Sequence, residues 1–301
     1  MEKHFRGVFA PIVTVFDENE RICPELIAEN IRIYNSTGLA GYMPLGSNGE
    51  FQGLTEEEAL LVLKTVVREA ASDKIIVGGC GRESVGKTVE FIRKVADCGL
   101  DYAFLLPPHY FAKQMSDAAL LRFFLAVEDA SPIPIVLYTA PKFTGGVGIS
   151  PSLAALLARH ENIVALKNSL LAPNREYLQA VDGLDFEIIA GNIGNFYTGL
   201  LEGCTSGVLS TASYMPELCV SLFELVEKGE FGKAEALSAK LQTISSKTAG
   251  SLAVAGVKCA MDVRGLHGGH VRLPLLDLTE AEKGRFAAVF EECEVGTVKT
   301  P

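Results

Sequence analysis

A lysine at the end of a short apolar segment is the first residue whose position suggests chemistry. Residues 163–167 read Ile-Val-Ala-Leu-Lys and are followed by Asn168 and Ser169. Burial disfavours the ammonium form of lysine and lowers its pKa, and a neutral amine can attack a carbonyl carbon to form an imine. A simpler arrangement also fits, in which the side chain reaches solvent and pairs with a carboxylate. Position alone leaves both interpretations of Lys167 open.

A tyrosine ends another apolar segment. Residues 135–138 read Ile-Val-Leu-Tyr and are followed by Thr-Ala-Pro. The hydroxyl of Tyr138 is suited to pass protons to and from an imine or an aldol oxygen. Taken by itself, Tyr138 is better explained as an aromatic side chain at the rim of the protein with its hydroxyl in water.

Two loops carry polar residues that suit substrate binding. Gly-Ser-Asn-Gly-Glu at 46–50 presents Ser47 and Asn48 between two glycines. Such a loop can direct backbone N–H groups and two short side chains at one carboxylate, although a plain turn explains it equally well. Pro-Pro-His-Tyr-Phe at 107–111 carries Tyr110 on a stiff loop. A structural loop and a subunit contact are both open for it.

Other polar residues are given structural interpretations. His267 and His270 are three residues apart, but the glycines beside them argue against a rigid pair of metal ligands. Glu50 is interpreted as a residue that caps or orients its loop rather than as a base. We therefore predict no metal site.

The candidate residues follow apolar segments that a single sheet would bring together. Eight short apolar segments alternate with helical patterns, and the expected strands are Val8–Phe16, Gly41–Leu45, Lys74–Gly78, Tyr102–Leu106, Ile135–Tyr138, Ile163–Lys167, Phe186–Ala190 and Gly207–Ser210. Strands that are apolar throughout belong to a parallel sheet covered by helices. Eight such units predict an α/β fold, the (β/α)8 TIM barrel, whose active sites lie where the strands end. The alternative, an open doubly wound sheet, favours a glycine-rich turn after the first strand, and Asp-Glu-Asn-Glu at 17–20 is no such turn.

Helix signals lie between the strands and beyond them. Thr55 and Glu58 form a capping-box pattern, Ser84 opens a helix that Gly99 closes, and Ser116 opens a helix to about residue 130. The remaining inter-strand helices are expected to be of similar length. Beyond residue 230 the pattern is helical only, with candidates at Phe231–Ser245, Val254–Val263 and Thr279–Glu292. We expect a barrel at 1–230 and a C-terminal helical extension at 231–301, packed on it as one structural unit.

Composition excludes several classes of function. The 301 residues carry a net charge of −10, which argues against a nucleic-acid partner because phosphate backbones need a basic face. No signal peptide and no apolar run long enough for a membrane span are evident. The seven cysteines include no CxxC pair, as expected for reduced thiols. We expect a cytoplasmic protein without a membrane partner.

As a set, the motifs are specific. Gly-Ser-Asn-Gly-Glu at 46–50, Leu-Tyr-Thr-Ala-Pro at 137–141 and Ile-Val-Ala-Leu-Lys at 163–167 resemble, in order and spacing, the class I pyruvate-dependent aldolases. That group includes dihydrodipicolinate synthase, N-acetylneuraminate lyase and 4-hydroxy-2-oxoglutarate aldolase, and the chain is similar to it from Gly7 to about Leu275. The resemblance implies a 2-oxo acid substrate, a homotetramer built as a dimer of dimers, and no metal or organic cofactor.

The resemblance also implies catalytic roles. Lys167 matches the lysine that forms the Schiff base, and Tyr138 matches the tyrosine that moves protons at the imine. Ser47 matches the hydroxyl that links this tyrosine to a second one. Tyr110 matches that second tyrosine, which in the family reaches into the site of the neighbouring subunit.

Substrate-binding roles follow in the same way. Ser47 and Asn48 match residues that hold the substrate carboxylate, partly through backbone N–H groups. Gly191 and Leu209 match positions that line the pyruvyl pocket, Leu209 through its carbonyl. Ser169, two residues after the lysine, is assigned to the same pocket.

Departures from the family pattern bear on the substrate. Phe143 stands where dihydrodipicolinate synthases carry an arginine for the semialdehyde carboxylate, with Lys142 beside it. Asn168 and Leu170 replace a common aspartate and a small residue. The Ser-Asn pair resembles 4-hydroxy-2-oxoglutarate and deoxy-hexulosonate aldolases. We therefore expect a 4-hydroxy-2-oxo acid substrate with pyruvate as the common fragment. Dihydrodipicolinate synthesis and a non-catalytic 2-oxo-acid binding protein are the alternatives, and the retained lysine and both tyrosines argue against the second.

Overall fold

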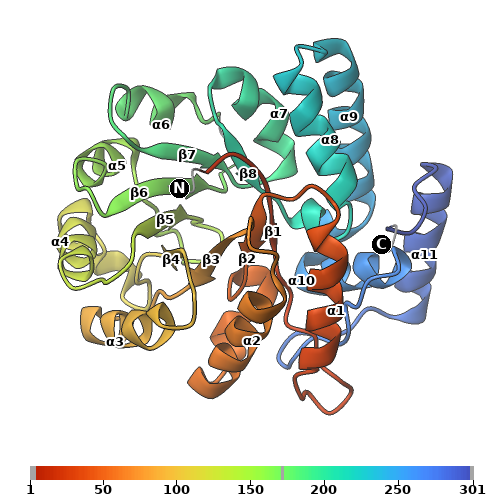
Figure 1. Ribbon diagram of the computed structural model, residues 1–301, viewed down its shortest axis with the longest axis horizontal. Helices are drawn as coiled ribbons and strands as arrows, with labels where there is room; N and C mark the ends of the chain where they lie inside the picture. The colour runs from red at the N-terminus through yellow and green to blue at the C-terminus, as the bar shows by residue number, and fades with distance from the viewer. Residues whose placement is uncertain (1–4, 171–172, 299–301) are drawn as a thin grey trace. The chain divides into compact units, whose positions relative to one another are not determined.

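The eight strands form one closed parallel barrel in chain order, which confirms the (β/α)8 fold (Figure 1). The computed structural model describes residues 5–170 and 173–298. The strands are β1 Gly7–Pro11, β2 Gly41–Met43, β3 Ile75–Gly79, β4 Tyr102–Leu105, β5 Ile135–Thr139, β6 Ile163–Asn168, β7 Glu187–Ala190 and β8 Ser206–Val208. Almost every strand residue is buried, because helices cover the outer face and packed side chains fill the interior.

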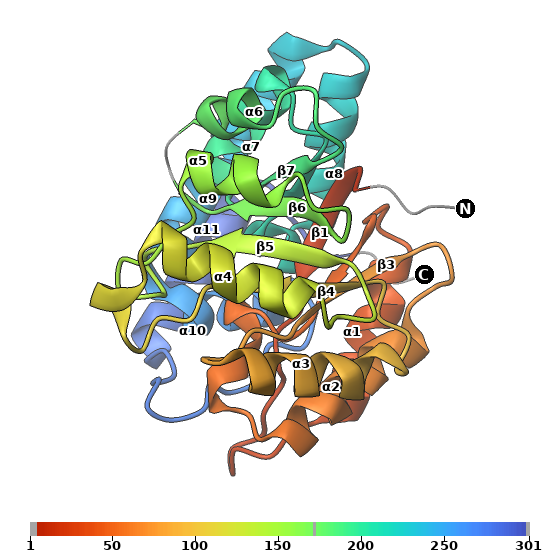
Figure 2. The ribbon, with the colours of Figure 1, turned by 90° about the vertical axis from the view of Figure 1, so that its left-hand side faces the viewer.

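Helices follow the strands and continue beyond the last of them. They are α1 Pro24–Asn35, α2 Glu56–Glu69, α3 Val85–Ala96, α4 Asp117–Glu128, α5 Pro151–Leu157, α6 Arg175–Ala180, α7 Ile193–Glu202, α8 Pro216–Glu227, α9 Phe231–Lys247, α10 Ala249–Val263 and α11 Glu280–Glu292. Short 3₁₀ turns lie at Ser47–Gly49, Phe51–Gly53, Ala112–Gln114 and Ser210–Ser213. In Figure 2, α3, α4 and α5 lie side by side outside β4, β5 and β6.

The helix starts expected at Thr55, Ser84, Ser116 and Thr279 are confirmed. Thr55 and Glu58 form a complete capping box, and the hydroxyls of Ser84 and Ser116 accept hydrogen bonds from backbone N–H groups three residues later. Thr279 and Glu282 form a second capping box at the start of α11. The expected helix at Val254–Val263 begins earlier, at Ala249, and contains a kink at residues 252–253.

Two expectations about element length are wrong. The first strand ends at Pro11, although the apolar run continues to Phe16. Residues 12–16 are buried but have left the sheet, and Phe16 forms isolated bridges to Ile22 and His270 instead. Helices α5 and α6 have only seven and six residues, much shorter than the helices around them.

The chain divides into two compact units. The first comprises residues 5–6 and 75–208, with β3 to β8, and the second comprises 7–74 and 209–298, with β1, β2 and α8 to α11. The predicted boundary between barrel and extension at 230/231 remains a prediction. Residues 1–4, the first part of the segment considered for a signal peptide, and residues 299–301 of the extension lie outside the described residues. Among the described helices, none has the length and apolarity that crossing a bilayer requires.

Candidate active site

Lys167 is a buried amine. It lies near the end of β6, and its side chain is only 6% exposed. Its Nζ lies 4.5 Å from the centroid of the Tyr138 ring and 5.5 Å from that of Phe104. Burial lowers the pKa of Lys167 from 10.5 to about 7, because the charged form loses its hydration. Near pH 7, Lys167 is therefore a neutral, nucleophilic amine in a substantial fraction of the protein molecules.

Tyr138 enters the interior beside Lys167. It is the register partner of Lys167 on β5 and is 4% exposed, so its hydroxyl is not a solvated group at the rim. Its ring stacks on Phe104, with centroids 4.8 Å apart and planes at 26°. The stacking fixes the plane of the tyrosine ring and so the direction in which its hydroxyl points.

Ser169 and Gly191 complete a group of four predicted residues. Ser169 Oγ lies 3.4 Å from the Tyr138 hydroxyl and 3.3 Å from the carbonyl oxygen of Gly191, and its single proton can be donated to only one at a time. A Cβ atom on Gly191 would lie 2.4 Å from both Ser169 Oγ and the carbonyl oxygen of Asn168. Only glycine therefore allows the ends of β6 and β7 to approach this closely.

Three asparagines that the sequence analysis did not single out, Asn174, Asn192 and Asn195, contact the residues at the end of β6. The buried Asn168 donates from Nδ2 to Asn174 Oδ1 at 2.9 Å and accepts from the Leu170 backbone N–H at 3.0 Å. The Leu170 carbonyl in turn accepts from the amides of Asn192 and Asn195. The side chain of Asn168 thus holds the backbone of Leu170. Isolated asparagines far apart in sequence carry no signal that would have revealed the cluster.

In the second unit, Ser47 and Asn48 lie in the 3₁₀ turn after β2, and both are half-buried. Asn48 Oδ1 accepts a hydrogen bond from Ser210 Oγ at 3.4 Å. Asn48 Nδ2 is buried and has no hydrogen-bond partner among the described residues. A buried amide donor without a partner is costly, and a ligand carboxylate would satisfy it.

Two strained backbone positions flank this turn. Leu45 and Glu50 adopt φ angles of 60° and 52°, in the left-handed region that costs about 1–2 kcal/mol for a residue with a side chain. Strain of this kind persists only where the surroundings hold it, and it concentrates at functional sites. Glu50 Oε1 lies 2.6 Å from Lys258 Nζ, and Oε2 accepts from the Arg272 backbone N–H at 2.9 Å. Both oxygens of the Glu50 carboxylate thus contact groups of the C-terminal part of the chain.

The other two predicted residues lie in different surroundings. Tyr110 is 79% exposed and packs edge-on against the exposed Phe111, with ring centroids 5.0 Å apart. The carboxylate of Glu83 accepts hydrogen bonds from the backbone N–H groups of His109 and Tyr110, both at 2.9 Å. Tyr110 is therefore held on the surface, outside the buried group around Lys167. Leu209 is buried, and its carbonyl accepts from the Ala212 N–H at 2.9 Å.

The two histidines weighed for metal binding pair with carboxylates instead. His267 Nε2 lies 2.8 Å from Glu29 Oε2, and His270 Nδ1 lies 2.6 Å from Asp277 Oδ2. In residues 5–170 and 173–298, no cluster of His, Cys, Asp and Glu has the makings of a metal site. The absence of a metal or organic cofactor remains a prediction.

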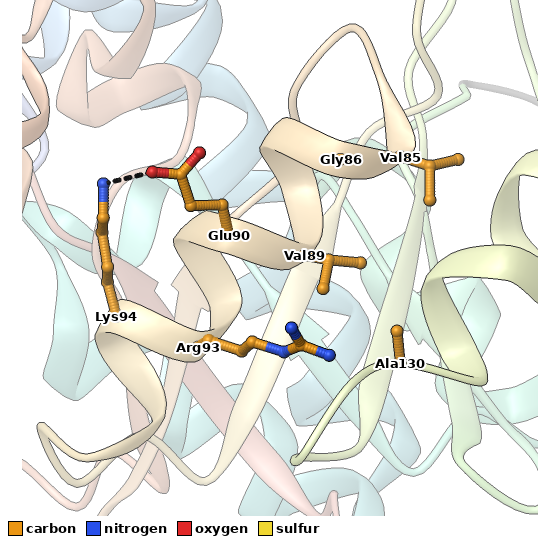
Figure 3. Close-up of a pocket in the computed structure, with 7 residues that line it drawn as sticks. All are labelled: Val85, Gly86, Val89, Glu90, Arg93, Lys94 and Ala130. Carbon is orange, nitrogen blue, oxygen red and sulfur yellow. Dashed lines mark ion pairs between the residues drawn. The ribbon is translucent and has the colours of Figure 1, made fainter.

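A surface groove between α3 and the end of α4 is a poor candidate for the catalytic site. Figure 3 shows Val85, Val89 and Arg93 of α3 facing Ala130, with Glu90 and Lys94 forming an ion pair at 2.8 Å. The groove is lined by helical residues and one loop residue, and none lies at the end of a strand. Active sites of (β/α)8 barrels lie at the strand ends, which is where Lys167 and Tyr138 are found.

Comparison with known proteins places the chain in a family. Residues 4–293 match the model of the dihydrodipicolinate synthetase family. A 4-hydroxy-tetrahydrodipicolinate synthase of Methanothrix thermoacetophila is 29% identical, over 95% of this chain and 96% of its own. An L-threo-3-deoxy-hexylosonate aldolase of Hypocrea jecorina is 32% identical, over 95% and 94%. The crystal structure of a dihydrodipicolinate synthase of Bacillus anthracis superposes with a TM-score of 0.90 at 25% identity, covering 96% of this chain and 99% of that one.

Proposed function

The chain belongs to the dihydrodipicolinate synthetase family and is a lyase of the class I aldolase type, and from this premise we propose that it cleaves or forms a carbon–carbon bond of a 4-hydroxy-2-oxo acid through a Schiff base on Lys167. Pyruvate is the common fragment. The observation that carries the proposal is the buried amine of Lys167, with a pKa of about 7, beside the ring of Tyr138. A neutral amine next to a proton donor is what imine formation requires.

The reaction begins when Lys167 Nζ attacks C2 of the substrate. One proton from the amine and one from Tyr138 pass to the C2 oxygen, which leaves as water, and a protonated imine remains. Tyr138 then accepts the proton of the C4 hydroxyl while the C3–C4 bond breaks. The electron pair of that bond moves into the imine and forms an enamine, and an aldehyde departs. Protonation at C3 and hydrolysis of the imine release pyruvate and restore the amine.

The substrate-binding roles are assigned from the hydrogen-bonding groups of the predicted residues. We assign the substrate carboxylate to Ser47 and to Asn48, whose Nδ2 is a buried donor without a partner among the described residues. Ser169 and Gly191 are assigned to the pyruvyl fragment because Ser169 Oγ lies within 3.4 Å of the Tyr138 hydroxyl and 3.3 Å of the Gly191 carbonyl oxygen. Leu209 is assigned to the same pocket.

The aldehyde fragment is proposed to be neutral or hydroxylated. Phe143 is 50% exposed, and its ring cannot form the bidentate contact with a second carboxylate that an arginine provides. The aldolase of Hypocrea jecorina, named for a deoxy-hexulosonate substrate, supports this substrate class. The synthase of Methanothrix thermoacetophila supports the alternative of dihydrodipicolinate synthesis, in which the exposed Lys142 would bind the semialdehyde carboxylate.

We further propose a cytoplasmic homotetramer in which Tyr110 serves the site of a neighbouring subunit. The support is the exposure of the Tyr110 and Phe111 rings, because large aromatic side chains are enriched at protein interfaces. Ser47 would connect Tyr110 to Tyr138 in the proton relay.

Covalent trapping tests the mechanism. The protein is incubated with pyruvate and sodium borohydride, digested, and analysed by mass spectrometry for a reduced adduct. We expect the adduct on Lys167 and its loss in Lys167→Met, while the buried Lys258 serves as an internal control that stays unmodified. A folded protein without an adduct on Lys167 would refute the Schiff-base mechanism. Turnover with a panel of 4-hydroxy-2-oxo acids then separates an enzyme from a binding protein.

A further inference from the structure

We propose that the ion pair between Glu50 and Lys258 positions the Ser47–Asn48 turn for the substrate carboxylate, which makes helix α10 part of the binding apparatus. The inference rests on the proposed function, because it takes from it the role of that turn. Glu50 and Lys258 are positioning residues in this view: they act through the turn, whose residues contact the substrate.

The turn ends in a backbone conformation that needs support. Glu50 has φ 52° and ψ 34°, in the left-handed region. Its N–H donates to the Ser47 carbonyl at 3.1 Å, and its own carbonyl accepts from the Gly53 N–H at 2.8 Å. These bonds make Glu50 the junction of two consecutive 3₁₀ turns. A side chain disfavours this conformation, so contacts of the Glu50 side chain must hold it in place.

Both oxygens of the Glu50 carboxylate are held by the C-terminal part of the chain. Oε1 lies 2.6 Å from Lys258 Nζ, and Oε2 accepts from the Arg272 N–H at 2.9 Å. The side chains of Glu50 and Lys258 are 5% and 1% exposed. Water screens such a pair weakly, and removing either partner leaves the other as an uncompensated buried charge.

Lys258 is itself firmly anchored. It projects from α10, donates to the carbonyl of His270, and its Nζ lies 4.6 Å from the centroid of the Phe16 ring. A carbonyl and an aromatic face therefore supplement the carboxylate as partners of the ammonium group. Groups outside the turn determine where the Lys258 amine lies. Through the ion pair, the amine in turn determines where the Glu50 carboxylate lies.

The opposite side of the turn is fixed by the segment after β1. Thr14 Oγ1 donates to the Gly49 carbonyl at 2.7 Å. A Cβ atom on Gly49 would lie 3.0 Å from the Ile12 carbonyl oxygen, so this backbone approach is close. Ser47 and Asn48 thus precede a junction that is held from two sides, and losing one side frees the turn to rotate.

The ion pair is not what attaches the C-terminal segment to the rest of the unit. Arg272 forms a bidentate ion pair with Glu58 of α2, at 2.8 and 2.9 Å, and also donates to the Gly53 carbonyl. This attachment survives when the Glu50 side chain is changed. We therefore expect variants of the pair to fold and to be altered mainly in the turn.

Affinity for the carboxylate is the decisive measurement. In Glu50→Gln and Lys258→Met, the pyruvate concentration for half-maximal borohydride trapping should rise about ten- to hundredfold, the usual cost of displacing positioned groups by around 1 Å. The saturating trapping rate should change less. Methyl pyruvate lacks the carboxylate, so its half-saturation should change less than about threefold. In the double variant the effect should equal that of one single variant, because either substitution already breaks the pair.

Glu217→Gln is the matched control. It breaks the pair between Glu217 of α8 and the buried Arg264 at the end of α10, so it weakens the packing of the same helix without touching the turn. We expect a lower melting temperature and unchanged half-saturation for pyruvate. Hydrogen exchange of residues 44–53 should accelerate in Glu50→Gln and Lys258→Met and stay as in the wild type in Glu217→Gln.

The outcomes separate the two proposals. Unchanged pyruvate affinity in both pair variants overturns the inference, as does an equal loss for pyruvate and methyl pyruvate, which would indicate a purely structural pair. Normal hydrogen exchange of residues 44–53 in both variants overturns it as well. If the wild-type protein gives no adduct on Lys167, the proposed function fails and the carboxylate assignment with it. The exchange rates then still decide whether the pair holds the turn.

Discussion

Lys167 and Tyr138 are register partners on the neighbouring strands β6 and β5, with the amine of one 4.5 Å from the ring centroid of the other. The ring face favours the ammonium form, by about 0.5–2 kcal/mol in a cation–π contact. Burial opposes it more strongly, since a pKa shift from 10.5 to about 7 corresponds to on the order of 5 kcal/mol. Desolvation therefore dominates, and the barrel interior prepares a neutral amine.

The rate of imine formation should rise with pH through about 7. Only the neutral amine attacks a carbonyl, and the fraction of Lys167 in that form grows as pH increases past its lowered pKa of about 7. Initial trapping rates at low pyruvate concentration, measured between pH 5 and 9, should give the ascending limb. A rate that is still rising steeply at pH 9, without a plateau, would contradict the desolvated amine.

Tyr138→Phe should lower kcat by about 10²–10⁴, the usual contribution of one positioned acid–base group. The protein should remain folded, because the ring and its stacking on Phe104 are retained. Steady-state turnover and thermal unfolding provide the two measurements.

Tyr177→Phe is a suitable control for this variant. The Tyr177 hydroxyl donates to the Ile149 carbonyl at 2.7 Å and is also buried. Its removal should cost about 1 kcal/mol of stability and leave kcat within about twofold. If Tyr138→Phe behaves like Tyr177→Phe, the Tyr138 hydroxyl has no catalytic role.

Gly191→Ala should be strongly impaired. The new methyl group would lie 2.4 Å from two atoms of the β6 end, so the backbone or Ser169 must move, at a cost of about 1–3 kcal/mol. We expect reduced pyruvate trapping together with a lower melting temperature. In Gly86→Ala, on α3, the methyl group meets no atom within 4 Å, and this variant should match the wild type in trapping. Normal trapping by Gly191→Ala would show that the β6–β7 approach is not needed.

Phe143→Arg should shift substrate choice toward aspartate semialdehyde. A charge-assisted contact with its carboxylate contributes about 1.5–3 kcal/mol, or roughly ten- to hundredfold in kcat/KM. The wild-type protein should prefer cleavage of 4-hydroxy-2-oxo acids over condensation with the semialdehyde. Leu156→Arg, at another half-exposed apolar position, controls for added surface charge. A wild-type preference for the semialdehyde by tenfold or more would assign the carboxylate contact to Lys142.

The fold could be predicted from local patterns because each strand is a short apolar run with a helix signal behind it. The prediction of the first strand was wrong because residues can be buried without belonging to the sheet. Residues 12–16 are as apolar as a strand and are buried, but β1 ends at Pro11, and the bridges of Phe16 to Ile22 and His270 lie outside the barrel strands. Apolarity reports burial only, so it could not show where the ladder stops. For the same reason, the apolar pattern could not show that α5 and α6 are short helices.

The candidate site could be predicted only in part. Lys167 and Tyr138 were identifiable because each lies next to the end of a strand, and the barrel places strand ends on one face. Asn174 and Asn195 act through contacts with Asn168 and Leu170 that depend on how the loops fold back, which no spacing reveals. The partner of Glu50 was equally hidden, because Lys258 sits in an ordinary helical stretch about two hundred residues later.

Because Glu50 and Lys258 are far apart in sequence, the ribosome makes them at different times. The ribosome makes the Ser47–Asn48 turn early, but the two groups that hold the Glu50 carboxylate, Lys258 Nζ and the Arg272 N–H, belong to nearly the last stretch of the chain. At a synthesis rate of about 5–20 residues per second, these two groups are added roughly 10–40 seconds after the turn. A nascent chain that has already completed β8 therefore still lacks both partners of the Glu50 carboxylate. Premature termination before α10 would leave a product that contains Lys167 but lacks the two groups that position the proposed carboxylate-binding turn.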